Sequence, residues 1–80
     1  MCLGIVGRIE SLTDEHPDLA QVEVAGVVRP INMALLDRET LRPGDWILIH
    51  AGFALEQIDE ETARMQIAAL RAYTGDPEPG

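Results

Sequence analysis

The chain has 80 residues, which is enough for one domain and too few for two. Apolar residues make up 46% of it, which favours a folded domain, and 14 acidic residues against six arginines give a formal net charge of −8. A chain this acidic lacks the basic surface that nucleic acid or an anionic membrane requires, so we expect neither as a partner.

The cysteine content and the hydropathy pattern indicate a cytoplasmic protein. Cys2 is the only cysteine, so no internal disulfide can form. The sequence has no basic segment followed by a long apolar one, as a signal peptide would have. No apolar run approaches the roughly 20 residues that a membrane helix needs.

The first part of the chain predicts three strands. Residues 2–12 alternate with a period of two, and a polar turn that contains Pro17 follows them. Residues 20–25 and 27–31 predict a hairpin with its turn at Gly26. Because Pro30 has no N–H to give to a ladder, we expect the third strand to lie at an edge or to end there.

The second part predicts two more strands and a helix. Residues 32–41 fit either a helical turn or a loop that closes one end of a barrel, and residues 42–45 form a turn signal. Residues 46–50 and 53–58 predict strands, joined where Gly52 lets the chain bend. Asp59 is a good N-cap for a helix over residues 59–74, whose apolar stripe contains Ala63, Ile67 and Leu70.

These elements predict a mainly β fold: a small five-stranded OB-like antiparallel β-barrel with one C-terminal α-helix. Residues 1–75 form the single domain, because Gly75 ends the helix, and residues 76–80 form a flexible tail. Trp46 to His50 is predicted as a central strand, with apolar residues on both faces. We expect the rings of Trp46 and Phe53 to anchor the core.

Cys2 is the first candidate for chemistry. Removal of Met1 would leave it with a thiol and a free α-amine, and its thiolate would be both a nucleophile and a soft metal ligand. The alternative is a small buried apolar residue, which a free cysteine often is. We favour the functional interpretation because a lone cysteine at a chain end is poorly placed for packing.

His50 ends an apolar strand and is the second candidate, either as a structural residue or as a metal ligand. His16 lies in an acidic turn with Asp14, Glu15 and Asp18, and we expect this turn to be solvated. The spacing of its acids does not match a calcium-binding loop. A Cys2–His50 pair also permits a thiol enzyme, but the chain offers no orienting third residue and little room for a substrate pocket.

Two segments together resemble a known family. Met1-Cys2-Leu3-Gly4-Ile5 followed by Gly7, and Gly44-Asp45-Trp46 running into Ile49-His50-Ala51-Gly52-Phe53-Ala54, resemble the HypC/HupF/HybG family. Members of this family are small chaperones of nickel–iron hydrogenase maturation. The resemblance covers essentially the whole chain. One departure is Val6, where the family commonly has a proline.

The resemblance implies an OB-like barrel that is not an enzyme and that handles iron. The family works with the maturation protein HypD, where an iron unit with cyanide and carbon monoxide ligands, Fe(CN)2CO, is assembled. It then escorts this unit to the precursor of the hydrogenase large subunit. By resemblance, Cys2 is an iron ligand and, with Leu3 and Gly4, part of the partner-binding segment. His50 is a second contributor to iron binding or complex formation.

Two other functions stay open. The chain would be a barrel adaptor if it bound a protein through Trp46, Phe53 or the helix, with Cys2 incidental. It would be a thiol enzyme if it showed turnover without any partner. Replacement of Cys2 separates the chaperone from the adaptor, because only the chaperone would lose its partners.

Overall fold

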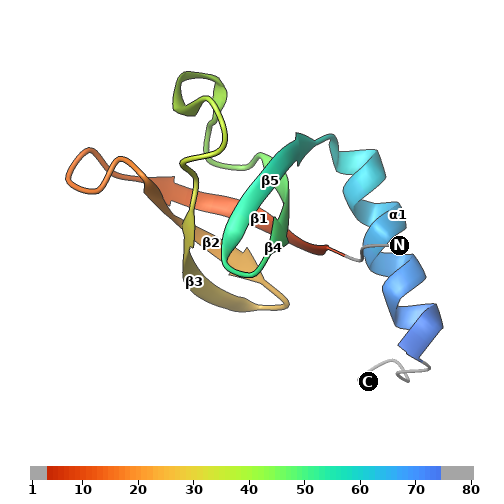
Figure 1. The fold of residues 1–80 in the computed structure, drawn as a ribbon. Coiled ribbons are helices and arrows are strands. Elements are labelled where there is room, and N and C mark those ends of the chain that lie inside the picture. The colour runs from red at the N-terminus through yellow and green to blue at the C-terminus, as the bar shows by residue number, and fades with distance from the viewer. Residues whose placement is uncertain (1–3, 75–80) are drawn as a thin grey trace.

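The computed structural model describes residues 4–74, with side chains as far as residue 69. Five strands, β1 (Ile5–Leu12), β2 (Leu19–Val24), β3 (Val27–Asn32), β4 (Trp46–His50) and β5 (Phe53–Ile58), are followed by the helix α1 (Glu60–Thr74). The strands form a closed barrel in the order β1-β2-β3-β5-β4. The predicted barrel with one C-terminal helix is therefore confirmed (Figure 1).

The barrel closes through one parallel pairing, which the sequence analysis did not predict. Four neighbouring pairs of strands are antiparallel, whereas β3 and β5 meet in parallel at Asn32 and Phe53. The N–H of Asn32 donates to the carbonyl oxygen of Gly52 at 2.9 Å. Because β3 ends where β5 begins, the two strands overlap only here, and among the described residues no strand pairs with the rest of β3 on this side.

Two hairpins have turns of the same kind. Ala25 and Gly26 connect β2 to β3, and Ala51 and Gly52 connect β4 to β5; all four residues have positive φ, between 53° and 85°. Positive φ at both central positions defines a type I′ turn, whose twist matches that of the flanking strands. The glycine signals at both turns were therefore interpreted correctly.

The core fills the barrel with apolar side chains from all five strands and from the connection between β3 and β4. Gly7 lies inside because a Cβ there would be 2.5 Å from Cγ1 of Val22 and 2.8 Å from Cδ1 of Ile49. The connection contributes Met33 and Leu41, and its only regular part among the described residues is a 3₁₀ turn, Arg38–Thr40. Residues 33–41 therefore form a loop that contains one short helical turn, and Asn32 belongs to β3. The core residues are Ile9, Ala20, Val22, Ile31, Met33, Leu41, Ile47, Ile49 and Ala54.

Helix α1 lies against the outside of β1 and β4, and its second half extends past the strands (Figure 1). The side chain of Asp59 accepts a hydrogen bond from the N–H of Thr62 at 2.7 Å, which makes Asp59 the predicted N-cap. Ala63 is fully buried and Ile67 is half-buried, so the stripe packs as expected as far as residue 67. Within residues 4–74, no helix is long and apolar enough to cross a membrane.

Several predictions fall outside the described residues. The predicted first strand began at Cys2, whereas β1 begins at Ile5, and Cys2 and Leu3 lie outside the described residues. The side chain of Leu70, the helix end at Gly75 and the tail over residues 76–80 lie outside them too.

Candidate functional site

Gly4 is the predicted site residue nearest the chain start whose position is described. It precedes β1, and a Cβ on it would be 2.7 Å from Cγ of Leu48 and 3.3 Å from the carbonyl oxygen of Ile49. Glycine is therefore required for the chain to approach β4 this closely. The carbonyl of Ile49 belongs to the peptide bond with His50, so Gly4 lies beside the backbone next to the candidate histidine.

The register of β1 and β4 continues this arrangement. Ile5 pairs with Ile49 and Val6 pairs with Leu48. Ile49 is buried in the barrel, so Leu48 and His50 belong to the outer face of β4, where Leu48 covers Gly4. The first described residue of the chain and His50 therefore lie at the same end of the barrel.

His50 is exposed, and it forms no hydrogen bond or ion pair with another side chain among residues 4–69. A histidine that merely satisfies a core would be buried and hydrogen-bonded. The structural interpretation of His50 is therefore not supported, and its imidazole is accessible to a ligand or a partner.

Phe53 forms a pair with His50 across the turn between β4 and β5. We call residues 50–53 the His50 turn. Directly opposite residues in a sheet have side chains on one face, so the ring and the imidazole leave the barrel on the same side. The Phe53 side chain is 42% exposed, so the prediction that it anchors the core was wrong. Ala54 takes the inward position instead, with 0% exposure.

Trp46 is half-buried rather than enclosed. It lies on the outer face of β4, paired with Arg8 of β1 and Ile58 of β5. The predicted central position of β4 is confirmed, because this strand pairs on both sides and Ile47 and Ile49 fill the core. The expected core anchor at Trp46 is instead a partly covered ring on the outside of the barrel.

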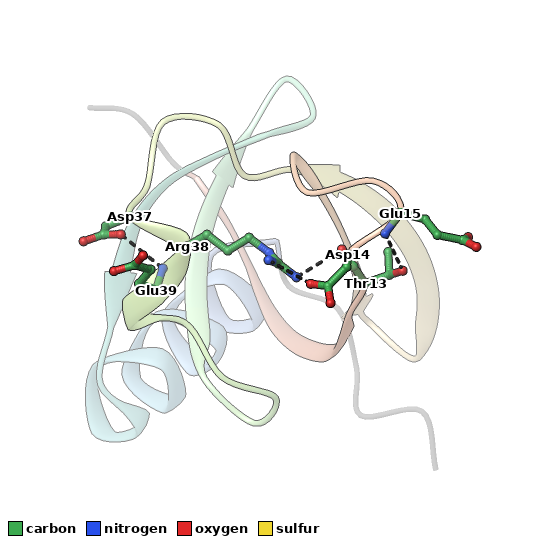
Figure 2. Close-up of polar contacts among 6 residues, drawn as sticks. All are labelled: Thr13, Asp14, Glu15, Asp37, Arg38 and Glu39. Atoms are coloured by element: carbon green, nitrogen blue, oxygen red, sulfur yellow. Dashed lines mark hydrogen bonds and ion pairs between the residues drawn. The ribbon is translucent and has the colours of Figure 1, made fainter.

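The acidic turn connects β1 to β2. Asp14, Glu15, His16 and Asp18 are all exposed, which confirms the prediction of a solvated turn. Figure 2 shows how Arg38 reaches this turn: its Nη2 donates to the carbonyl oxygen of Thr13 at 3.0 Å, and its Nη1 to Oδ1 of Asp14 at 3.4 Å. The part of the chain that the structure describes contains no group of three or more His, Cys, Asp or Glu residues able to hold a metal ion.

The comparisons with known proteins match these features to one family. The model of the HupF/HypC family matches residues 1–70, a range that contains Cys2, Gly4 and the His50 turn. The chain belongs to the HupF/HypC family.

Relatives support this membership over almost the full chain. The hydrogenase maturation factor HybG of Escherichia coli (strain K12) is 40% identical over 78 residues, which is 95% of both chains. The hydrogenase maturation factors HypC of Rhodobacter capsulatus and Azotobacter chroococcum mcd 1 are 44% and 46% identical. These two alignments cover 89% and 88% of this chain, and 76% and 79% of the relatives.

The sequence analysis missed the exposed side of the His50 turn. The sequence did contain this information, because a turn of two residues places positions 50 and 53 opposite each other on one face. Val27 and Val28 of β3 are 50% and 52% exposed. The sequence analysis expected this strand to lie at an edge because of Pro30, and among the described residues the side of β3 away from β2 has a strand neighbour only at Asn32.

Proposed function

We propose that this protein is a hydrogenase maturation chaperone that carries an Fe(CN)2CO unit through Cys2. In this proposal it receives the iron unit in a complex with a HypD-type protein and delivers it to the precursor of the hydrogenase large subunit. The protein acts by binding and transfer, and we assign no catalytic residue. The observation that carries the proposal is the family match over residues 1–70, together with relatives that are named hydrogenase maturation factors.

The geometry at the start of β1 supports the roles of Cys2 and His50. Gly4 is packed against Leu48 and the backbone of Ile49. Cys2 precedes Gly4 by two residues in the sequence. In this proposal the thiol acts at the end of the barrel at which His50 is exposed.

A protein that carries an iron unit and passes it on should supply only some of the ligands of the iron. A closed structural zinc site takes four protein ligands, whereas Cys2 and His50 supply one thiolate and one imidazole. Cyanide and carbon monoxide would occupy other positions on the iron, and a partner would supply the rest. A thiolate is a suitable soft ligand for such an iron ion. A carrier that contributes few ligands can release the iron unit when a partner with more ligands binds it.

The test is an anaerobic pull-down with purified HypD-type protein and large-subunit precursor, and infrared spectra of the eluates. We compare the wild type with Cys2→Ser, which changes only the sulfur atom. We also compare His50→Ala with His16→Ala, which removes the exposed histidine of the acidic turn. The wild type and His16→Ala should retain both partners and show bands of metal-bound cyanide and carbon monoxide. Cys2→Ser should lose both, and His50→Ala should weaken the bands.

The outcome also decides between the chaperone and the adaptor. If Cys2→Ser retains the same partners as the wild type and neither eluate contains cyanide or carbon monoxide on a metal, Cys2 is incidental. The protein would then be an adaptor that binds through its exposed residues, among them Phe53.

A further inference from the structure

The outer edge of β3 has no partner strand among the described residues over residues 27–30, a segment that we call the β3 edge. Its inner neighbour β2 pairs with β3 along the whole strand, from Leu19–Asn32 to Val24–Val27. On the other side, β5 meets β3 only at Asn32. All four residues of the β3 edge are exposed, so nothing described covers either face of it.

The phase of the hairpin determines which backbone groups point away from β2. In a hairpin with a two-residue turn, the residues that flank the turn form a hydrogen-bonded pair, here Val24 and Val27. The pairs then alternate, so residues 28, 30 and 32 direct their backbone groups away from β2. The bond from the N–H of Asn32 to Gly52 confirms this phase, because it leaves β3 on the outer side.

The β3 edge therefore presents the N–H and carbonyl of Val28 and the carbonyl of Pro30. Proline at position 30 removes a donor only from the outer side, which explains how β3 continues past it to Asn32 with its ladder to β2 complete. It also prevents a long added strand from forming a full set of bonds, a common protection against unspecific pairing of edges. The edge can hold a short segment, centred on Val28.

The side chains of the β3 edge determine which charge a bound segment would need. Arg29 shares a face of β3 with Val27 and Ile31, and it is exposed. The ion pairs of the described residues involve Arg8, Arg38 and Arg64, and Arg29 takes part in none of them. On a chain with a net charge of −8, this gives the edge a local positive charge next to two exposed valines.

From these observations we infer that the β3 edge binds an extended segment of a maturation partner as an additional antiparallel strand. Antiparallel pairing is the more stable arrangement, and it gives Val28 a reciprocal pair of hydrogen bonds. The segment carries an acidic side chain opposite Arg29, followed towards its C-terminus by apolar side chains opposite Val28 and Val27. This inference rests on the proposed function, because it specifies how a partner of that function is recognised.

The location of the β3 edge explains why such binding would serve the candidate site. The next outward residue of β3 after Pro30 is Asn32, which is already bonded to Gly52 of the His50 turn. A strand added at the edge would therefore end against the His50 turn, beside the exposed Phe53. The partner would be anchored next to His50 without covering it.

The test compares backbone and charge variants in binding to purified HypD-type protein and purified large-subunit precursor. Val28→Pro removes the outward N–H and leaves the ladder to β2 intact, whereas Val28→Thr keeps the N–H and the side-chain shape. Arg29→Glu reverses the charge at the edge, and Arg42→Glu makes the same change at an exposed arginine outside it. We expect Val28→Pro and Arg29→Glu to weaken binding to at least one partner about tenfold, and both controls to stay within about twofold of the wild type.

Amide hydrogen exchange of the wild type by NMR tests the same inference without a substitution. The Val28 amide should exchange fast in the free protein and slowly in the complex, whereas the Arg29 amide, already bonded to β2, should be slow in both. The inference is overturned if the Val28 amide still exchanges fast in the complex. It is also overturned if both edge variants bind like the wild type while Cys2→Ser does not, and in that case the proposed function stands.

Two other outcomes overturn the inference in different ways. If Val28 becomes slow in the free protein as its concentration rises, the edge is occupied by a second copy of this chain rather than by a partner. If the wild type binds neither partner protein, the proposed function fails and the inference fails with it.

Discussion

At the scale of single residues, Gly7 occupies a position with no room for a side chain. A methyl group there would meet Val22 and Ile49 at distances well inside van der Waals contact. Gly7→Ala should therefore lower the free energy of unfolding by about 1–3 kcal/mol, the usual range for overpacking a core. Urea unfolding followed by far-UV circular dichroism measures it.

A double mutant shows whether this loss comes from the contact with Val22. Val22→Ala removes the Cγ1 atom that a Cβ at position 7 would meet first. Gly7→Ala combined with Val22→Ala should therefore cost less than the sum of the two single losses. Strict additivity would mean that the strain lies elsewhere, for example at Ile49.

At the scale of elements, the start of α1 depends on an ionised carboxylate. Hydrogen bonds from the side chain and then the backbone N–H of Thr62 hold the pKa of Asp59 below its ordinary value. A lowered folded-state pKa means that the stabilisation is complete above the unfolded-state pKa, which is near 3.9 for aspartate, and is lost as the pH falls through the folded value. We expect the wild type to lose helical circular dichroism in this acidic range.

Asp59→Asn separates this effect from other titrations in the same helix. Asparagine is an equally good N-cap and does not titrate. All other residues are identical in the two proteins, so the difference between the two acid titrations belongs to Asp59. The wild type should lose stability relative to Asp59→Asn as the pH falls. Parallel curves would show that the carboxylate has no special role in the cap.

The elements themselves were largely predictable, because local patterns specify them. Trp46–His50 and Phe53–Ile58 have the bounds that alternation and the Gly52 turn predicted. The orientation of Phe53 was not predictable in the same way. Phe53, Ala54 and Leu55 are all apolar, so the sequence shows no alternation, and the register with β4 alone turns Ala54 inward and leaves Phe53 exposed.

Local sequence patterns could not predict how the barrel closes either. The parallel contact between Asn32 and Phe53 joins residues that are far apart in the sequence, and no turn signal specifies it. The free edge of β3 follows from this contact, so the sequence could indicate an edge at Pro30 but not its length or its neighbour. Gly4 and His50 were named as site residues, whereas their position at one end of the barrel required the β1–β4 register.

At the scale of the whole molecule, two regions of the barrel differ in how they are held. The region of Gly4 and the His50 turn is held by close backbone packing, and the His50 side chain remains accessible. The region of the loop between β1 and β2 is held by Arg38, which links this loop to the 3₁₀ turn (Figure 2). Its ion pair with Asp14 contributes little, because the Asp14 side chain is 99% exposed.

This difference predicts unequal effects for the two partners of that ion pair. Asp14→Asn should change the free energy of unfolding by less than about 0.5 kcal/mol, since an exposed pair is screened by solvent. Arg38→Ala should cost about 1–2 kcal/mol, because the carbonyl of Thr13 loses its donor and the loop loses the packing of the arginine stem. Thermal unfolding of the two variants at low and high salt measures both. Equal losses that disappear in high salt would instead mean that the Arg38–Asp14 ion pair holds the loop between β1 and β2 to the 3₁₀ turn.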